Sequence, residues 1–233
     1  MQPTTTATYS KTRKLTTLAV LSAIAYVVWV VGRIPMLSAG NLILRYDPKE
    51  IIIVFAGFIF GPMAVFAMSL VVSFVQMVTL SETGPIGFIM NVISTCAFAC
   101  TASYIYKKRQ TLSGAVIGLV CGVLFMTAVM LLWNYLLTPI FMGVPREAVV
   151  ALLLPMFLPF NLVSGGLNAT VTLLLYKPLT RALRAAKLLP EREYAPEAAG
   201  PATARKGSLG VFLVSGILLI SCILLVLSFR GII

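Results

Sequence analysis

The residues of this sequence that could do chemistry are polar side chains inside, or at the ends of, long apolar runs. A polar side chain in such a run must find a partner, so it is costly unless it is used. The candidates are Gln76, Asn91, Asn134, Asn161 and Asn168, with Glu82 and Thr83 at a turn between two runs. Amides donate and accept hydrogen bonds at once, which suits a ligand with imide or hydroxyl edges. These side chains therefore predict the binding of a polar ligand.

Two of these asparagines lie beside aromatic residues, Asn134 in LLWNYLLTP and Asn161 in LPFNLVSGG. Their aromatic neighbours, and Tyr46 in an earlier segment, offer flat faces on which a ring could stack. These neighbours are Trp133, Tyr135 and Phe160. In the alternative interpretation, the amides bond neighbouring helices and the aromatic residues mark the membrane interface. The residues alone leave both interpretations open.

Catalysis has little support in the sequence. The chain has no histidine and no GxxxxGK[ST] phosphate loop, and all seven acidic residues lie at or outside the ends of the apolar runs. We therefore expect no enzyme, no metal site and no resident cofactor. The chain also lacks the means to hydrolyse ATP by itself. The sequence predicts a binding subunit of the membrane that depends on partners for energy.

The elements that position these residues are membrane helices. Hydrophobic residues make up 59% of the chain and charged residues 11%, and the mean hydropathy is +0.99. This exceeds what a soluble domain of 233 residues could bury. Continuous rather than alternating apolar runs favour helices over a barrel. The net charge of +11 is explained by basic residues that flank apolar helices, so we expect the bilayer and no nucleic acid as the partner.

We predict an all-α polytopic bundle of six helices with one more transmembrane helix at the C-terminus. The expected spans cover about 15–31, 51–60, 62–80, 85–106, 112 to a loop at Pro139, and Pro159 to 176, with a loop or re-entrant turn from Ala148 before the last. The second expected span, 51–60, is shorter than the about 20 residues that a helix needs to cross a bilayer. The predicted domains are a cytoplasmic tail over 1–14, the substrate-binding membrane domain over 15–186, a cytoplasmic linker over 187–207 and the extra helix over 208–233.

The charge pattern predicts the topology. Four charged residues, Arg45, Asp47, Lys49 and Glu50, precede the short second span and cannot lie in lipid, so we expect a structured loop at a membrane face. With the N-terminus in the cytoplasm, 13 of the 18 Lys and Arg residues fall inside, as the positive-inside rule favours. The segments 45–50, 81–84 and 139–147 then meet on the outer face and form a mouth.

Small residues recur four apart along several runs, a spacing at which helix backbones can approach closely in lipid. They are Ala19 and Ala23, Gly57 and Gly61, and the series Gly114, Gly118 and Gly122. Ordinary packing inside the bundle is the simplest interpretation of the glycines.

Several motifs in one order resemble those of a known family. The stretches LRYDPKEI, GFIFGP, SETGPIGFIMN, WNYLLTPIFMGVP and LPFNLVSGGLNA, within residues 15–179, are similar to the riboflavin-specific S component of energy-coupling factor (ECF) transporters. The resemblance implies a six-helix subunit of the cell membrane that captures riboflavin at the outer face. It also implies partners, a transmembrane T subunit and two ATPase subunits.

The resemblance also implies roles for individual residues. Tyr46, Asn91, Asn134 and Asn161 match the family's ligand contacts, and Ala19 with Ala23 matches the Ala-xxx-Ala face that docks on the T subunit. The family often has lysine three residues after the PFN asparagine, where this chain has Ser164. Another vitamin, such as folate or pantothenate, is therefore the alternative ligand, and a ligand-free membrane scaffold is the alternative function.

Overall fold

The computed structural model describes residues 11–39, 42–80 and 83–185, together with five isolated positions between 216 and 227. The helices are α1 (Lys11–Gly32), α2 (Lys49–Phe60), α3 (Pro62–Thr79), α4 (Gly84–Thr95), η1 (Cys96–Cys100), α5 (Thr101–Arg109), α6 (Leu112–Met142), α7 (Arg146–Leu152), η2 (Leu153–Phe157) and α8 (Leu158–Ala185). Two π-helical segments, η1 and η2, join their neighbours without a break. Residues 11–185 therefore form six continuous helices in their described part, which confirms the predicted six-helix bundle.

Five of these helices are long and apolar enough to cross a membrane, and the sixth, α2, has only 12 residues. The prediction of one short helix among longer ones is confirmed. Gly61 ends α2 with a φ of +87°, a left-handed conformation that favours glycine. Pro62 then opens α3, where its fixed φ and missing N–H are tolerated. The Gly-Pro pair thus reverses the chain between two helices.

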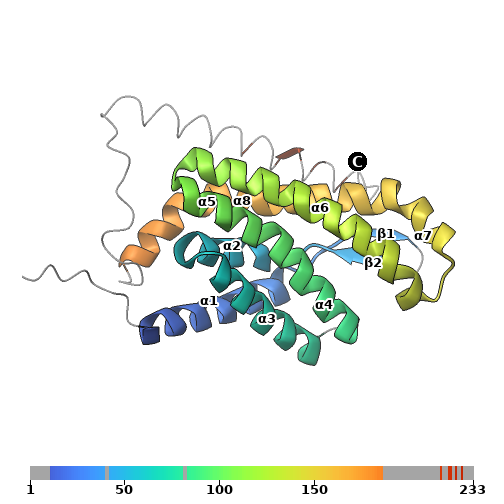
Figure 1. The fold of residues 1–233 in the computed structure, drawn as a ribbon, viewed down its shortest axis with the longest axis horizontal. Coiled ribbons are helices and arrows are strands. Elements are labelled where there is room, and N and C mark those ends of the chain that lie inside the picture. Colours follow the sequence, from blue (N-terminus) through green and yellow to red (C-terminus); the bar gives the residue numbers. More distant parts are fainter. Residues whose placement is uncertain are drawn as a thin grey trace, which may run out of the picture.

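The short helix lies in the middle of the bundle. It contacts α1, α3, α5 and α8, and Ile53, Val54 and Ala56 on it are fully buried. In Figure 1, α1 and α3 lie on one side of α2, and α6 and α8 lie on the other. The two sides are bridged by α2 and by α4, which contacts both α3 and α6.

A β-hairpin connects α1 to α2, and the sequence analysis did not predict it. Strands β1 (Pro35–Ala39) and β2 (Leu42–Arg45) are antiparallel, with Leu37 opposite Leu44. The backbone N–H of Tyr46 donates to the carbonyl of Ile34 at 2.7 Å and closes the base of the hairpin. Figure 1 shows the hairpin at the same end of the bundle as α7.

Two predicted loops were wrong, and both contain proline. Helix α6 continues through Pro139 to Met142, although we expected it to end before a loop there. The segment from Ala148 is helical as well, and Pro155 lies inside the π-helical segment η2. Proline removes one backbone donor, and a local π turn or a nearby helix end accommodates that loss inside membrane helices.

The glycine series on α6 packs inside the bundle, as the sequence suggested. A Cβ atom on Gly118 would lie 2.7 Å from the carbonyl oxygen of Ala102, and one on Gly122 would lie 2.6 Å from that of Phe98. On α2, a Cβ atom at Gly57 would lie 1.9 Å from Oγ of Ser103. These glycines let α6 and α2 approach the helix that runs from α4 through η1 to α5.

The predicted extra helix over 208–233 and the linker over 187–207 lie outside the described residues, apart from the five isolated positions. So does the first part of the N-terminal tail; α1 begins at Lys11. These parts of the domain assignment stay predictions.

Candidate ligand-binding site

A cavity of about 270 Å³ opens at the hairpin end of the bundle. Pockets for small organic ligands start at roughly 300 Å³, so this one is of the size for a single compact ligand. Its walls come from α1, the hairpin and the loop after it, α2, α3, α4, α6, η2 and α8. The three segments expected at one mouth all contribute, through Asp47, Thr83 and Phe141. The prediction that they meet at one site is confirmed.

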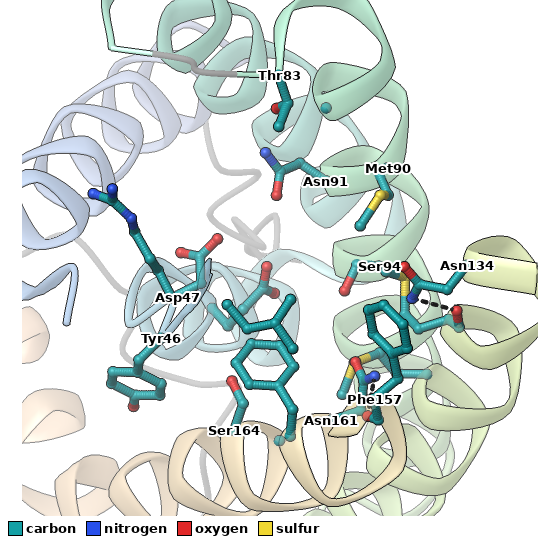
Figure 2. Close-up of a pocket in the computed structure, with 18 of the residues that line it drawn as sticks. Tyr46, Asp47, Thr83, Met90, Asn91, Ser94, Asn134, Phe157, Asn161 and Ser164 are labelled. Carbon is teal, nitrogen blue, oxygen red and sulfur yellow. Dashed lines mark hydrogen bonds between the residues drawn. The ribbon is translucent and has the colours of Figure 1, made fainter. Parts of the chain in front are cut away.

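All four predicted ligand contacts, Tyr46, Asn91, Asn134 and Asn161, line this cavity. Figure 2 shows Asn91 on α4, and it shows Asn134 and Asn161 close to Phe157 on the side away from Tyr46. The structure therefore brings together residues from four distant parts of the sequence. Their contact with a ligand stays a prediction.

The side chains of Asn134 and Asn161 are buried, with 3% and 4% of their surface exposed. Nδ2 of Asn134 donates to the carbonyl of Met130, and Nδ2 of Asn161 donates to that of Phe157, both at 2.7 Å. Oδ1 of Asn134 also accepts a hydrogen bond from Thr138 at 3.0 Å. These bonds stay within the asparagines' own helices, so they fix each amide plane at the cavity wall without linking two helices.

The apolar wall differs from the prediction in its aromatic members. Phe160 and Tyr46 line the cavity as expected, but Trp133 and Tyr135 are not among its lining residues. The Tyr135 ring instead lies against the guanidinium group of Arg146, at 5.1 Å from ring centroid to Cζ. Phe157, in η2, is almost fully buried and takes a place at the wall that the sequence did not indicate.

A pair of hydrogen bonds holds the loop after the hairpin on α8. The Tyr46 hydroxyl donates to Oδ1 of Asn168 at 2.8 Å, and Nδ2 of Asn168 donates to the carbonyl of Asp47 at 3.1 Å. Asn168 is buried and lines the cavity as well. The polar groups of Tyr46 and Asn168 thus position the loop that forms one wall.

The charged residues predicted to lie in an outer loop are folded into the protein. Lys49 and Glu50 form the first turn of α2, and Lys49 is fully buried. Nζ of Lys49 pairs with Asp47 and lies 3.8 Å from Oε1 of Glu50. The Thr95 hydroxyl donates to the same Oε1 at 2.5 Å. A buried cation requires such close carboxylate partners, and both carboxylates also line the cavity.

The polar side chain of Gln76 lies at the wall without a hydrogen-bond partner among the described residues. Gln76, on α3, is 1% exposed, and neither Oε1 nor Nε2 has a hydrogen-bond partner among the described residues. In the sequence Gln76 is a polar residue in an apolar run, and no pattern there assigns it to the site. In the part of the chain that the structure describes, no three His, Cys, Asp or Glu side chains are grouped to hold a metal ion.

The predicted docking residues lie on the outside of α1, away from this cavity. Ala19 and Ala23 are exposed, whereas Ser22 is buried and donates to the carbonyl of Leu18 at 2.8 Å. The exposed side of α1 also carries Val20, Ile24 and Val27. This side is apolar and is not covered by the described part of the chain.

Comparison with known families decides the class of protein. The family model described as ECF transporter, substrate-specific component, matches residues 13–176. This chain belongs to the substrate-specific (S) components of ECF transporters. The family consists of transporter subunits, which confirms that the S component is not an enzyme.

Curated relatives narrow the comparison. The S component is 28% identical to the riboflavin transporter RibU of Streptococcus thermophilus over 180 residues, 73% of this chain and 84% of that protein. It is 29% identical to RibU of Staphylococcus aureus over 179 residues, 74% of this chain and 93% of the relative. It is 25% identical to the riboflavin transporter FmnP of Bacillus subtilis over 175 residues, 71% of this chain and 91% of the relative.

A solved structure shares the fold. It is described as the S component of a bacterial ECF transporter, and it aligns with a TM-score of 0.62 and 28% identity over 75% of this chain and 99% of the other. The matched part of the S component is thus its six-helix bundle. This confirms the multi-pass membrane architecture predicted from composition.

Proposed function

We propose that this S component binds riboflavin in the cavity at the hairpin end and delivers it into the cell together with a T subunit and two ATPase subunits. The observation that carries the proposal is the wall at which two fixed amides, Asn134 and Asn161, border Phe157 and Phe160. The names of the three relatives, all riboflavin transporters, support the choice of vitamin.

The chemistry of riboflavin matches this wall. Its tricyclic ring is flat and largely apolar, and one edge carries an imide with alternating carbonyl and N–H groups. Asparagine amides present the complementary donor and acceptor, and aromatic and methionine side chains cover the ring faces. The methionine side chains in this cavity include those of Met90 and Met130. Ser164 lies in the wall as well, so the absence of the family's lysine leaves a small hydroxyl there.

We further propose that the cavity faces the outside of the cell and the N-terminus the cytoplasm. The excess of Lys and Arg in the segments at the opposite membrane face supports this orientation. The exposed face of α1 with Ala19 and Ala23 then docks on the T subunit, because small side chains let a foreign helix approach closely. Riboflavin is the cargo in this scheme, and no resident cofactor takes part.

Identification of the ligand that the protein retains from cells tests the proposal. The S component would be purified in detergent without added vitamin, then denatured, and the released small molecules identified by absorbance and mass spectrometry. We expect a yellow protein that releases riboflavin in an amount approaching one per chain. Folate or pantothenate in its place would support the alternative vitamins. A colourless, empty protein that binds none of the three would indicate a scaffold.

A further inference from the structure

We propose that Gln76 and Glu50 form a separate part of the cavity that binds the hydroxyl groups of a polyol chain. The inference rests on the proposed function, because it assigns one part of riboflavin, its hydroxylated side chain, to these two residues. It adds to the amide wall of Asn134 and Asn161 a second set of polar contacts, from α2 and α3.

The Gln76 side chain is buried and has no hydrogen-bond partner among the described residues. A buried amide without hydrogen bonds is strongly unfavourable, so such groups are rare in native proteins. Here both polar atoms of the Gln76 side chain are inaccessible and have no partner among the described residues, yet the residue lines an open cavity. A molecule in the cavity would supply the missing partners once the side chain rotates toward it.

Glu50 also lines this cavity, and one of its carboxylate oxygens is an acceptor without a partner among the described residues. Its Oε1 accepts from Thr95 and lies near Lys49, whereas its Oε2 is buried without a hydrogen-bond partner among the described residues. Lys49 and Thr95 therefore fix the carboxylate group while one oxygen remains for a ligand donor. Asn134 differs, because each of its two polar atoms already makes one hydrogen bond within α6, and only its second N–H and second lone pair remain for a ligand.

The donors and acceptors define the class of ligand group. The carboxylate oxygen accepts only, and the amide of Gln76 both accepts and donates. A hydroxyl group also does both, so the adjacent hydroxyls of one chain can pair with a carboxylate oxygen and with an amide. A flat ring with one polar edge would satisfy them less well. The hydroxylated chain of a flavin fits this set.

Binding of two flavins that differ only in this chain tests the inference. Riboflavin and lumiflavin, which carries a methyl group in place of the polyol chain, would be titrated into ligand-free wild-type protein and the Gln76→Leu variant. We expect Gln76→Leu to weaken riboflavin binding by about 10- to 100-fold, as for a lost buried hydrogen bond, and to change lumiflavin binding by less than about threefold. Glu50→Gln, which keeps the shape of the side chain, should also weaken riboflavin binding more than lumiflavin binding. The loss should be smaller than in Gln76→Leu.

Ser73→Ala is the matched control. Ser73 lies one turn before Gln76 on α3, is fully buried with a hydroxyl that has no partner among the described residues, and is not among the lining residues of the cavity. The control should bind both flavins as the wild type does. Melting temperatures of all variants report on folding, and Gln76→Met replaces Gln76→Leu if the latter does not fold.

The outcomes separate this inference from the proposed function. Equal losses for both flavins in the Gln76 variant would mean that Gln76 supports the fold, and unchanged binding of both would mean that it contacts only water. Either result overturns the inference while riboflavin binding by the wild type stands. If the folded wild-type protein binds neither flavin, the proposed function itself fails.

Discussion

At the scale of single residues, the side chains of Asn134 and Asn161 each make a hydrogen bond within their own helix and also line the cavity. One N–H of each side chain donates to the carbonyl four residues earlier, which fixes the amide plane. Each amide keeps a second N–H, and Asn161 also keeps its oxygen free of hydrogen bonds to the described residues. A ligand can therefore meet groups whose orientation is set before it arrives, which reduces the entropy lost on binding.

We predict that Asn134→Ala or Asn161→Ala weakens riboflavin binding by about 10- to 100-fold, because a polar edge of the ligand loses its partner in a buried site. Quenching of flavin fluorescence in a titration of the purified variants measures this. Thr127→Val is the control, since Thr127 is buried on α6, donates to the carbonyl of Val123, and does not line the cavity. Unchanged affinity in both asparagine variants would refute their role.

Tyr46 has a structural role beside the predicted ligand contact, which stays a prediction. Its hydroxyl bonds Asn168 and anchors the loop after the hairpin. We predict that Tyr46→Phe speeds riboflavin release by about 2- to 10-fold, since one neutral hydrogen bond contributes about 0.5–1.5 kcal/mol to holding that wall. Stopped-flow measurement of release tests this.

The control for that experiment is Tyr26→Phe, which removes a hydroxyl bonded to Thr79 at 2.8 Å outside the cavity. The control should release riboflavin as the wild type does. Release from Tyr46→Phe at the wild-type rate would contradict the anchoring role, and Tyr46 would then act only through its ring.

The sequence identified polar residues of the site but not how each is used. Asparagine inside an apolar run is visible in the sequence, and all four predicted contacts do line one cavity. The lack of partners at Gln76 depends on which side chains α1, α2 and α4 bring near it, which no local pattern contains. The place of Phe157 at the wall depends on the π-helical segment η2, because an extra residue in a turn rotates the side chains that follow.

At the scale of elements, apolar runs predicted the helices well. Helix α3 was expected over 62–80 and covers Pro62–Thr79, because the Gly-Pro pair is an unambiguous boundary. Prolines inside runs were misleading, since the segment at Pro139 was expected to be a loop, and the one from Ala148, which contains Pro155, a loop or re-entrant turn. In water a proline usually ends a helix, whereas in a membrane bundle the helix continues because no water replaces the lost backbone bonds. The hairpin was missed because strands of five and four residues leave little periodic signal.

Helix α1 combines a packed side and an open side, and only the strip of Ala19 and Ala23 on the open side is the proposed docking surface. We predict that the double variant Ala19→Trp with Ala23→Trp binds riboflavin as the wild type does but no longer co-purifies with a T subunit. Two indole rings would prevent close approach of a partner helix, and close packing supplies much of the association energy in lipid. Co-expression, affinity purification and flavin titration measure the two properties separately.

The matched control is Val20→Trp with Ile24→Trp. These residues are also exposed and four apart, but they point about 100° around the helix from the alanines. The control should keep both binding and co-purification. Normal co-purification of the alanine variant would show that the T subunit docks elsewhere. Loss of riboflavin binding in that variant would show that α1 shapes the cavity.

At the scale of the whole molecule, the cavity and a buried aromatic cluster lie on different residues. Phe55, Tyr106 and Tyr176 form a buried cluster in which the two tyrosine hydroxyls lie 2.7 Å apart, and none of the three lines the cavity. The short helix α2 joins these regions, since Glu50 in its first turn lines the cavity and Phe55 belongs to the cluster. One end of the bundle is thus open for a ligand while another region is filled by aromatic side chains.

The membrane class, the six helices and the family could all be predicted from the sequence, because composition and ordered motifs extend over most of the chain. Orientation and the extra C-terminal helix stay predictions. The family match ends at residue 176, before the basic linker and the last apolar run begin. We therefore expect that run to be an accessory element.

The central claim is that this S component binds riboflavin in preference to other vitamins. Its most direct test is an equilibrium titration of folded, ligand-free protein, with flavin fluorescence as the signal and folate or pantothenate as competitors. We predict saturable binding of one riboflavin per chain that a hundredfold excess of either competitor does not displace. Absence of saturable riboflavin binding, or displacement by folate or pantothenate at equal concentration, would contradict the claim.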